Sequence, residues 1–375
     1  MAGYVFAIGG ASDPVAVIKN SAEKGVYAVY MRTLAPLPFE GTLADYLSMK
    51  PGDNIYFFCK RKYYGVGELV SVGGDCKYCN YPTASNLSTT SYEKIKDELL
   101  VDFGPDSDKY RWICTFKGSP YFFENGLDTD EILNYKPGTF KMLRAFWKVS
   151  FIKIGDEENE SLKEIFLLRH QKELATKTGV FSEDPATHHR IHEKITGEYA
   201  LSVKPILESC CRAGGRLGHE MALEAATVHA LAADAIPALG HWDYISHQVI
   251  ASPFKPIDYM DKIDIFASRY LPGTTIPCQY LVAELKKDEA DYDTIDQVMK
   301  YVDWVCNEYS YGDYGFIEAC VIAYGYPDDI LAYIEKNGKR NYILGSHPVT
   351  NKQWGELKLL SYRYVDGEVV YKQIL

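Results

Sequence analysis

The sequence predicts an α/β protein with two domains, a β-rich domain followed by one in which strands alternate with helices. Short apolar runs separated by glycine and proline fill residues 1–155, a pattern typical of small β-barrels. Over residues 201–375, strand-like runs are separated by segments with helical spacing, as in α/β sheets. The chain has 375 residues, of which 47% are hydrophobic, so it is long enough for two hydrophobic cores.

The amino-terminal domain is expected to consist of short strands. The runs 54–59 and 64–70 are rich in aromatic and β-branched residues and lie close together, so they predict a hairpin. Beyond this domain, Leu162 and Phe166 have helical spacing, and residues 156–200 are interpreted as a helical connector. Further strands are predicted at 4–8, 26–31 and 112–116.

Two acidic strands carry the strongest functional signal, and both lie in the carboxyl-terminal domain. Successive side chains of a strand point to opposite faces, so Asp264 faces away from its two isoleucine neighbours. By the same alternation, Glu284 and Lys286 share one face of the following strand. If the two strands pair, two carboxylates and one lysine can therefore converge.

A helix is predicted after the second acidic strand, over residues 291–306. Gln297 and Tyr301 are separated by one helical turn, so they share a helix face. We expect that face to point toward the acidic strands. Trp304 lies on the same stripe and is interpreted as a core aromatic.

This combination of groups indicates metal-dependent cleavage of phosphodiester bonds. Hard divalent cations such as Mg²⁺ bind carboxylate oxygens and keep several water molecules. A bound cation can activate water and stabilise the charge that develops on a phosphoryl group. Asp264 and Glu284 are the expected ligands of Mg²⁺ or Mn²⁺, and Lys286 is expected to position the attacking water.

The carboxyl-terminal domain resembles the restriction-endonuclease-like fold of the PD-(D/E)XK nuclease superfamily, above all its NucS-type members. The residues that carry the resemblance are Asp264, Glu284, Lys286, Gln297 and Tyr301. The resemblance implies that these residues act in catalysis and that an acid on an earlier helix joins the metal site. Glu220 and Glu224 lie one turn apart on such a helix, and both stay open as metal ligands, with Glu220 preferred.

The amino-terminal domain resembles the EVE and YTH branch of PUA-like domains. The resemblance rests on the segments 49–58, 64–68 and 144–154. Domains of that branch hold a flipped and often modified base in an aromatic-lined pocket. The candidates for lining such a pocket are Trp112, Trp147, Tyr30 and Phe58.

The charge balance limits how the protein can bind nucleic acid. A net charge of −11 excludes a protein that coats nucleic acid indiscriminately, because neutralised phosphates supply most non-specific affinity. Candidates for local backbone contacts are Lys60, Arg61, Lys62, Arg144 and Lys148. A groove that tracks a backbone and stacks a base is suggested by a cluster of basic and aromatic residues, Lys141, Arg144, Lys148 and Lys153 with Phe140, Phe146, Trp147 and Phe151 between them. The alternative is a β-domain in which core aromatics alternate with solvated lysines.

These features predict a modification-dependent, restriction-type DNA endonuclease with an amino-terminal reader. Two alternatives stay open: a repair endonuclease that recognises mismatches or DNA structure, and a nucleic-acid-binding protein without catalysis. DNA is the expected partner in preference to RNA, and a homodimer is expected because a double-strand break needs two active sites. Nine cysteines, no signal-peptide pattern and no membrane-length apolar run predict a cytoplasmic protein with reduced thiols.

Overall fold

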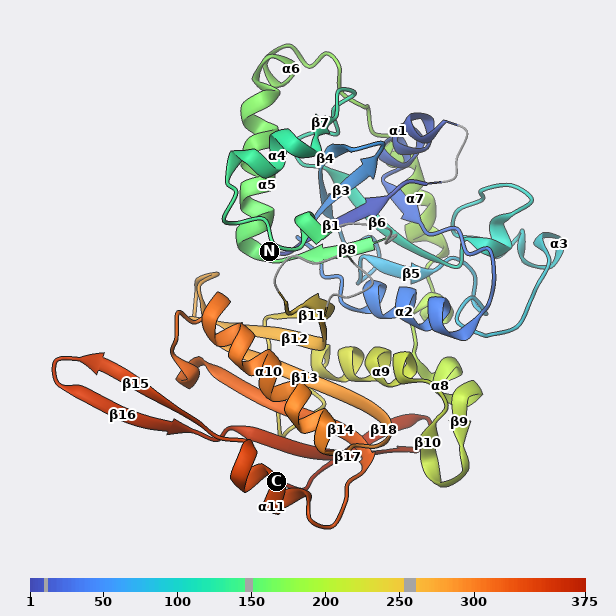
Figure 1. Cartoon of the computed structure of the whole chain (residues 1–375). Helices are drawn as coiled ribbons and strands as arrows, with labels where there is room; N and C mark the ends of the chain where they lie inside the picture. Colours follow the sequence, from blue (N-terminus) through green and yellow to red (C-terminus); the bar gives the residue numbers. More distant parts are fainter. Residues whose placement is uncertain (10–12, 146–150, 253–260) are drawn as a thin grey trace. The chain divides into compact units, whose positions relative to one another are not determined.

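The computed structural model describes residues 1–9, 13–145, 151–252 and 261–375. The chain divides into two compact units, and Figure 1 shows their helices and strands in sequence colours. Unit 1 comprises Met1–Ala35 and Asp45–Ser202, and unit 2 comprises Pro36–Ala44 and Val203–Leu375. The roles of reader, connector and nuclease that the sequence suggests for 1–155, 156–200 and 201–375 stay predictions.

Unit 1 contains a mostly antiparallel sheet of eight strands in which β1 and β3 are parallel. The strand order is β2-β6-β4-β3-β1-β8, with β5 paired to β6 and β7 paired to β4. The strands are β1 (Gly3–Ala7), β2 (Val26–Ala28), β3 (Asn54–Cys59), β4 (Lys62–Leu69), β5 (Lys77–Cys79), β6 (Trp112–Gly118), β7 (Leu127–Asp128) and β8 (Phe151–Ile154). Among the residues that the structure describes, no ladder joins β2 to β8, so the closed PUA-like barrel stays a prediction.

The helices in this part of the chain are mostly short. They are α1 (Pro14–Lys24), α2 (Pro36–Leu47), α3 (Tyr92–Ile95), α4 (Thr129–Tyr135), α5 (Asp156–Arg169), α6 (Gln171–Thr176) and α7 (Pro185–Lys194). Most of α2, Pro36–Ala44, is assigned to unit 2. The predicted hairpin is confirmed as β3 and β4. Its two turn residues, Lys60 and Arg61, have φ angles of 48° and 63°. Positive φ at both positions matches the twist of a two-residue hairpin.

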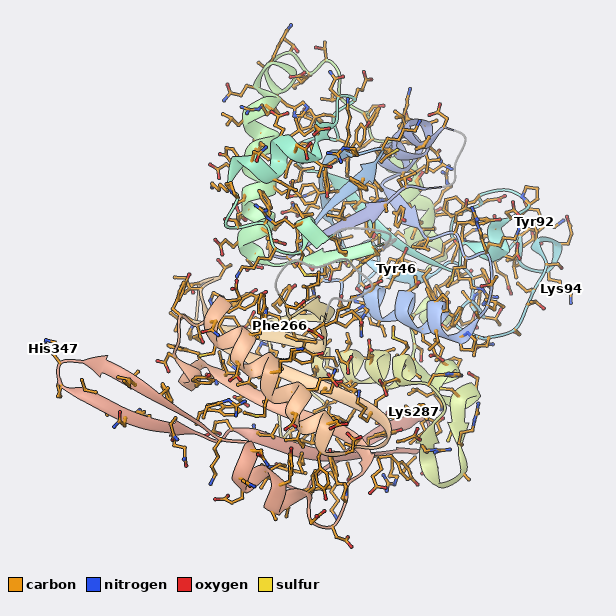
Figure 2. All side chains as sticks on the ribbon, in the orientation of Figure 1. Tyr46, Tyr92, Lys94, Phe266, Lys287 and His347 are labelled. Atoms are coloured by element: carbon orange, nitrogen blue, oxygen red, sulfur yellow. The ribbon has the colours of Figure 1, made fainter. Side chains whose placement is uncertain are left out.

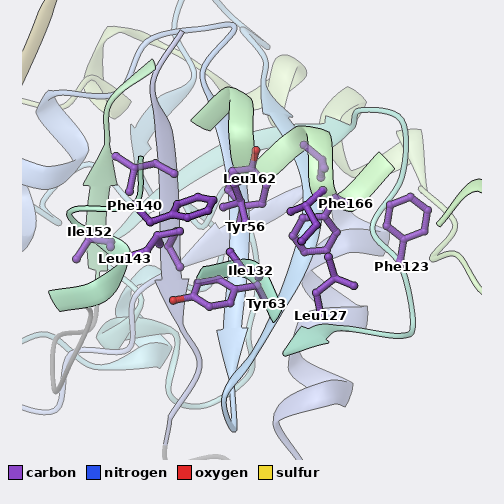
Figure 3. Packing of buried hydrophobic residues seen from close by; sticks show 14 residues of the cluster. Tyr56, Tyr63, Phe123, Leu127, Ile132, Phe140, Leu143, Ile152, Leu162 and Phe166 are labelled. Atoms are coloured by element: carbon purple, nitrogen blue, oxygen red, sulfur yellow. The ribbon is translucent and has the colours of Figure 1, made fainter. Parts of the chain in front are cut away.

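Helix α5 packs against the hydrophobic core of unit 1. The helical spacing of Leu162 and Phe166 is confirmed, because both residues lie in α5 and are fully buried. The Phe166 ring lies 5.9 Å from the Tyr56 ring, measured between centroids. Figure 3 shows this cluster, in which α5 covers strand residues such as Tyr56 and Ile152.

A buried acid lies at the start of α5. The carboxylate of Glu158 accepts hydrogen bonds from the backbone N–H groups of Met142, at 2.6 Å, and of Lys141. Burial raises the pKa of Glu158 to about 7, although these backbone donors oppose the shift. The folded protein therefore keeps a proton on Glu158 at pH values where the unfolded chain has lost it. The associated stability is present below pH 4.5, the ordinary pKa of this group, and is lost as the pH rises to about 7.

Replacement of this acid should flatten part of the pH dependence of folding. In Glu158→Gln, the free energy of unfolding should rise relative to the unmutated protein between pH 5 and pH 7, by at most about 1.4 kcal/mol per pH unit. Urea unfolding at several pH values measures this difference. Glu157→Gln is the matched control, since Glu157 is the exposed neighbour on the same helix. A parallel pH profile for Glu158→Gln and the unmutated protein would contradict the prediction.

Unit 2 is built on a mixed six-stranded sheet with the order β11-β12-β13-β14-β17-β18. The strands β13, β14 and β17 are parallel to one another, and the remaining pairs are antiparallel. The sheet strands are β11 (Tyr244–Ile250), β12 (Lys262–Tyr270), β13 (Pro277–Glu289), β14 (Ile317–Gly325), β17 (Leu357–Val365) and β18 (Glu368–Gln373). The α/β class predicted for this part of the chain is confirmed.

The other elements of unit 2 flank this sheet or project from it. The helices are α8 (Lys204–Cys210), α9 (Glu220–Ala232), α10 (Tyr292–Glu308) and α11 (Ile330–Asn337), and a short pair is β9 (Cys211–Arg212) with β10 (Arg216–Leu217). The strands β15 (Arg340–Ser346) and β16 (Val349–Trp354) form a two-stranded sheet of their own, which projects from unit 2 in Figure 1.

The middle of strand β13 is buried in unit 2. Both α9 and α10 contact it, and every residue from Leu281 to Leu285 is buried. Helix α10 begins at the predicted position, where the Asp291 carboxylate caps it by accepting the N–H of Thr294 at 2.9 Å. Within the described ranges, no helix is both long enough and apolar enough to cross a membrane.

Candidate active site

Pairing of the two acidic strands brings Asp264 and Glu284 together. Strands β12 and β13 are antiparallel, and Ile265 pairs with Ala283. One step along this register, Asp264 lies opposite Glu284 on the same face of the sheet. The two carboxylates are close enough for each to shift the pKa of the other. The convergence that the sequence made conditional on strand pairing is thus present in the structure.

Asp264 is held by groups on both neighbouring strands. Its Oδ2 accepts the backbone N–H of Leu285 at 2.8 Å, and its Oδ1 accepts the side-chain amide of Gln248 at 3.3 Å. The residue is 9% exposed. Burial and then the nearby carboxylates of Glu284 and Glu224 raise the pKa of Asp264 well above its ordinary value. A positive charge placed between these acids would therefore be strongly favoured.

Glu284 and Lys286 form the second half of the site. Lys286 Nζ donates to Glu284 Oε1 at 2.8 Å, as the alternation along β13 predicted for two residues on one face. Burial raises the pKa of Glu284, while Lys286 opposes the shift. Burial lowers the pKa of Lys286, but the adjacent Glu284 carboxylate more than compensates, and the pKa of Lys286 is raised. The next residue of β13 is Lys287, which is labelled in Figure 2.

The two acids of α9 have different surroundings. Glu224 is 2% exposed, and its Oε1 accepts the amide of Gln248 at 2.9 Å. The side chain of Glu220 is 37% exposed, lies 3.8 Å from Lys286 Nζ, and accepts the backbone N–H of Lys287 at 3.3 Å. Glu224 therefore adjoins Asp264, whereas Glu220 adjoins the lysine. This arrangement favours Glu224 as the helix acid of a metal site, in contrast to the preference for Glu220 drawn from sequence.

Gln297 and Tyr301 share a face of α10, as their spacing predicted. Gln297 Nε2 donates to Tyr301 Oη at 2.8 Å. Burial raises the pKa of Tyr301 to about 12, the Gln297 bond opposes this shift, and the carboxylates of Glu284 and Asp264 add to it. Tyr301 is thus near enough to both acids to interact with them electrostatically. As a neutral phenol at physiological pH, it can donate a hydrogen bond but carries no charge.

Two site residues escaped the sequence analysis, His247 and Gln248 in β11. His247 Nδ1 lies 3.4 Å from Glu224 Oε2, and Gln248 bonds to both Glu224 and Asp264. The run Tyr244–Ile250 is rich in β-branched and aromatic residues, which is a strand signal. Recognition of that strand could have suggested a third strand beside Asp264, although not the contacts that His247 and Gln248 make with the acids.

The chemistry of the donors fits a hard divalent cation. Within the described part of the chain, Glu224 Oε2 and Glu284 Oε2 are buried and have no hydrogen-bond partner. Carboxylate oxygens are the ligands that Mg²⁺ and Mn²⁺ prefer. Across the same described residues, no three acidic, histidine or cysteine side chains are placed so that they could hold a metal ion together. Lys286 and Gln248 instead provide donors to three of the acids, so a cation would have to displace or supplement these donors.

The residues suggested for a base pocket lie in different surroundings in unit 1. Trp112 is 1% exposed and lies 6.3 Å from the Tyr46 ring. Phe58 packs against Tyr63 in the core, with 4.7 Å between ring centroids. Tyr30 is 40% exposed and contacts Tyr110 edge-on. Trp147 lies outside the described residues. Of the described candidates, Tyr30 is therefore the most exposed, whereas Phe58 is half-buried and Trp112 is buried.

The residues suggested for backbone contacts are mainly at one turn. Lys60, Arg61 and Lys62 are exposed at the tip of the β3–β4 hairpin, where Arg61 pairs with Asp130 at 2.8 Å. Arg144 is also exposed and donates to the carbonyl of Pro137 at 2.6 Å. Lys148 lies outside the described residues.

The interpretation of Lys153, Phe140 and Phe151 as part of a surface groove is wrong. All three are buried, and Lys153 donates to the carbonyl of Ser48 at 3.2 Å. Burial lowers the pKa of Lys153 to about 8. A lysine between aromatic residues resembles an exposed basic patch in sequence, but here its charge faces the carboxylate of Asp53, which opposes the pKa shift.

Comparisons with known proteins do not assign the chain to a family. No family model matches it, and no curated protein matches it. Two chains of solved structures match, and one is described as a repair endonuclease from Pyrococcus abyssi. That match has 18% identity and a TM-score of 0.23, and it covers 38% of this chain and 47% of the other. The aligned part is thus about half the length of that endonuclease, and the resemblance to PD-(D/E)XK nucleases stays a prediction.

Neutralisation of one buried acid should stabilise the metal-free protein. In Glu284→Gln, the amide oxygen can accept from Lys286 and the amide nitrogen can donate to Asp264, which removes the repulsion between two carboxylates. We expect the melting temperature in EDTA to rise by about 2–4 °C. Differential scanning calorimetry measures it, with Glu289→Gln, the exposed glutamate at the end of the same strand, as the control. A lower melting temperature for Glu284→Gln would contradict the assigned repulsion.

Proposed function

We propose that the protein is a metal-dependent endonuclease that hydrolyses phosphodiester bonds in DNA. The observation that carries the proposal is the set of buried acids Glu224, Asp264 and Glu284 with Lys286 2.8 Å from one of them. A fold has no need of three adjacent buried carboxylates, since like charges in a low-dielectric interior destabilise one another. Acids with raised pKa values beside one lysine, here Asp264 and Glu284, are typical of sites that bind a cation and carry out catalysis.

Asp264, Glu284 and Glu224 are the proposed ligands of Mg²⁺ or Mn²⁺. When bound, the cation would supply Lewis acidity toward a phosphoryl oxygen and lower the pKa of a coordinated water. The carboxylates would hold it on one face of the sheet, and the backbone N–H of Leu285 fixes the orientation of Asp264 at 2.8 Å. Glu220 would act from the rim, through Lys286.

Lys286 is proposed to orient the attacking water and to stabilise negative charge on the phosphate. Its raised pKa keeps the ammonium group protonated near neutral pH, so Lys286 acts as a hydrogen-bond donor and not as a base. Gln297 is proposed to fix the orientation of the Tyr301 hydroxyl through their 2.8 Å bond. Tyr301 can then donate a hydrogen bond toward the acids without adding charge.

The finer proposal is that unit 1 selects the DNA, with a modified base as the preferred target. The aromatic residues Tyr30, Phe58 and Trp112 and the basic turn at Lys60 and Arg61 belong to this unit. An exposed cationic hairpin tip suits contact with a phosphate backbone. An exposed aromatic ring such as Tyr30 suits base stacking. The homodimer and the cytoplasmic location stay predictions.

Removal of the central groups should abolish cleavage while the fold is kept. Asp264→Ala and Lys286→Ala should each reduce the DNA cleavage rate by about 100-fold or more, since each loses charge stabilisation of the transition state. EDTA should stop cleavage by the unmutated protein, and Mg²⁺ or Mn²⁺ should restore it. A plasmid-nicking assay measures the rates, and circular dichroism checks the fold.

Lys287→Ala is the matched control for the lysine variant. Lys287 is the next residue of β13, and its charge pairs with Asp288. It should cleave at nearly the unmutated rate. Comparable cleavage by Lys286→Ala and Lys287→Ala would remove Lys286 from the proposed mechanism, and cleavage that survives EDTA would remove the metal.

A panel of plasmids should identify the recognised DNA. Unmodified, cytosine-modified and mismatch-bearing plasmids are incubated with the protein and Mg²⁺, and the fraction cut is measured on gels. We expect preferential cutting of the modified plasmid. Preferential cutting of the mismatched plasmid would replace this proposal with a repair endonuclease. Binding without cutting of any plasmid would indicate a nucleic-acid-binding protein.

A further inference from the structure

Gln248 has an unusual backbone conformation within an otherwise regular strand pair. His247 pairs with Ile265 and Val249 pairs with Ile263, so the register of β11 against β12 is the same on both sides of Gln248. No residue is inserted, and the irregularity is confined to one position. The φ angle of Gln248 is 54°, in the left-handed region that glycine favours and that other residues adopt at an energetic cost.

This conformation lets two consecutive side chains approach the same acid. In a regular strand, His247 and Gln248 would point to opposite faces of the sheet. Here His247 Nδ1 lies 3.4 Å from one oxygen of Glu224, and Gln248 Nε2 lies 2.9 Å from the other. Strained backbone that persists at a cluster of charged groups is commonly linked to the function of that cluster.

The amide of Gln248 links two carboxylates from different elements. Its nitrogen donates to Glu224 of α9 at 2.9 Å and to Asp264 of β12 at 3.3 Å. Ionised carboxylates only accept hydrogen bonds, so the nitrogen, with its two hydrogens, must face them. Because the amide is neutral, it orients both acids without cancelling their charge. A lysine in its place would compete with a cation.

We infer that Gln248 is a positioning residue that orients Glu224 and Asp264 as ligands of a divalent cation. The inference rests on the proposed metal site and extends it. Groups that orient metal ligands typically change the affinity for the metal by 10–100-fold when they are removed, and change the chemistry at saturating metal much less. Gln248 should therefore determine how much metal the protein needs.

Titration of the full-length protein with Mn²⁺ alone, without DNA, tests this inference. By isothermal titration calorimetry, Gln248→Ala should bind Mn²⁺ about 10-fold or more weakly than the unmutated protein. Gln248→Gly should show the same weakening although glycine adopts the positive φ freely, which separates the amide from the backbone conformation. Cleavage by both variants should need more Mn²⁺ for half-maximal activation, with a rate at saturation within a few-fold of normal.

Gln279→Ala is the matched control. Gln279 is also half-buried and lies on β13 of the same sheet, about 17 Å along the strand from Glu284. This variant should bind Mn²⁺ as the unmutated protein does. Should Gln248→Ala prove unfolded by circular dichroism, Gln248→Asn replaces it, since asparagine tolerates positive φ but is one methylene too short to bridge both acids.

The outcomes separate this inference from the proposed function. Equal Mn²⁺ affinity in the unmutated protein, Gln248→Ala and Gln248→Gly would overturn the role of Gln248 alone. Weakening in Gln248→Ala but not in Gln248→Gly would assign the effect to the backbone and also overturn it. If both variants bind Mn²⁺ more weakly and the unmutated protein cuts no DNA, the positioning role of Gln248 is supported and the proposed nuclease activity is rejected. No Mn²⁺ binding by the unmutated protein would overturn both.

Discussion

The site depends on the antiparallel pairing of β12 with β13, which sets Asp264 opposite Glu284 inside the protein. Two carboxylates in this arrangement repel each other, and burial strengthens that repulsion because little water screens it. The neighbouring groups reduce the effect of this repulsion. Lys286 neutralises one acid, while the backbone of Leu285 and the amide of Gln248 bond to the other. Each of these groups is common on a strand with one solvent-exposed face.

Burial of β13 on both sides accounts for the depth of the site. Helices α9 and α10 both contact this strand, so a side chain on either face is removed from solvent. Helix α9 is apolar on almost all sides, and Glu224 lies in its middle. Glu220 is the first residue of the same helix and stays partly exposed. The position of an acid along one helix therefore decides whether it meets Asp264 or the solvent-facing side of Lys286.

Local periodicity was sufficient to find the core of the site and insufficient to complete it. The alternation of side chains along a strand predicts the shared face of Asp264, Glu284 and Lys286. The spacing of one helical turn predicts the contact between Gln297 and Tyr301. Gln248 depends on which strand pairs with β12 and on a left-handed backbone angle, and neither can be derived from a pattern of apolar residues. In unit 1, Lys153 is buried within the sheet, although its position among aromatic residues suggested a groove at the surface.

The β15–β16 hairpin differs from the rest of unit 2 in how it is supported. Its ladder joins residues that are close in sequence, and Arg340 lies opposite Trp354. His347, between the two strands, is labelled at the tip of the hairpin in Figure 2. The base of the hairpin is anchored, since Trp354 Nε1 donates to the carbonyl of Ile317 in β14 and Arg340 pairs with Asp303 of α10. Beyond this base, the ladder can open without disturbing the six-stranded sheet, because an isolated pair of strands is only marginally stable. In hydrogen exchange, the amides of this hairpin should therefore lose protection by local opening, while those of β13 exchange through global unfolding.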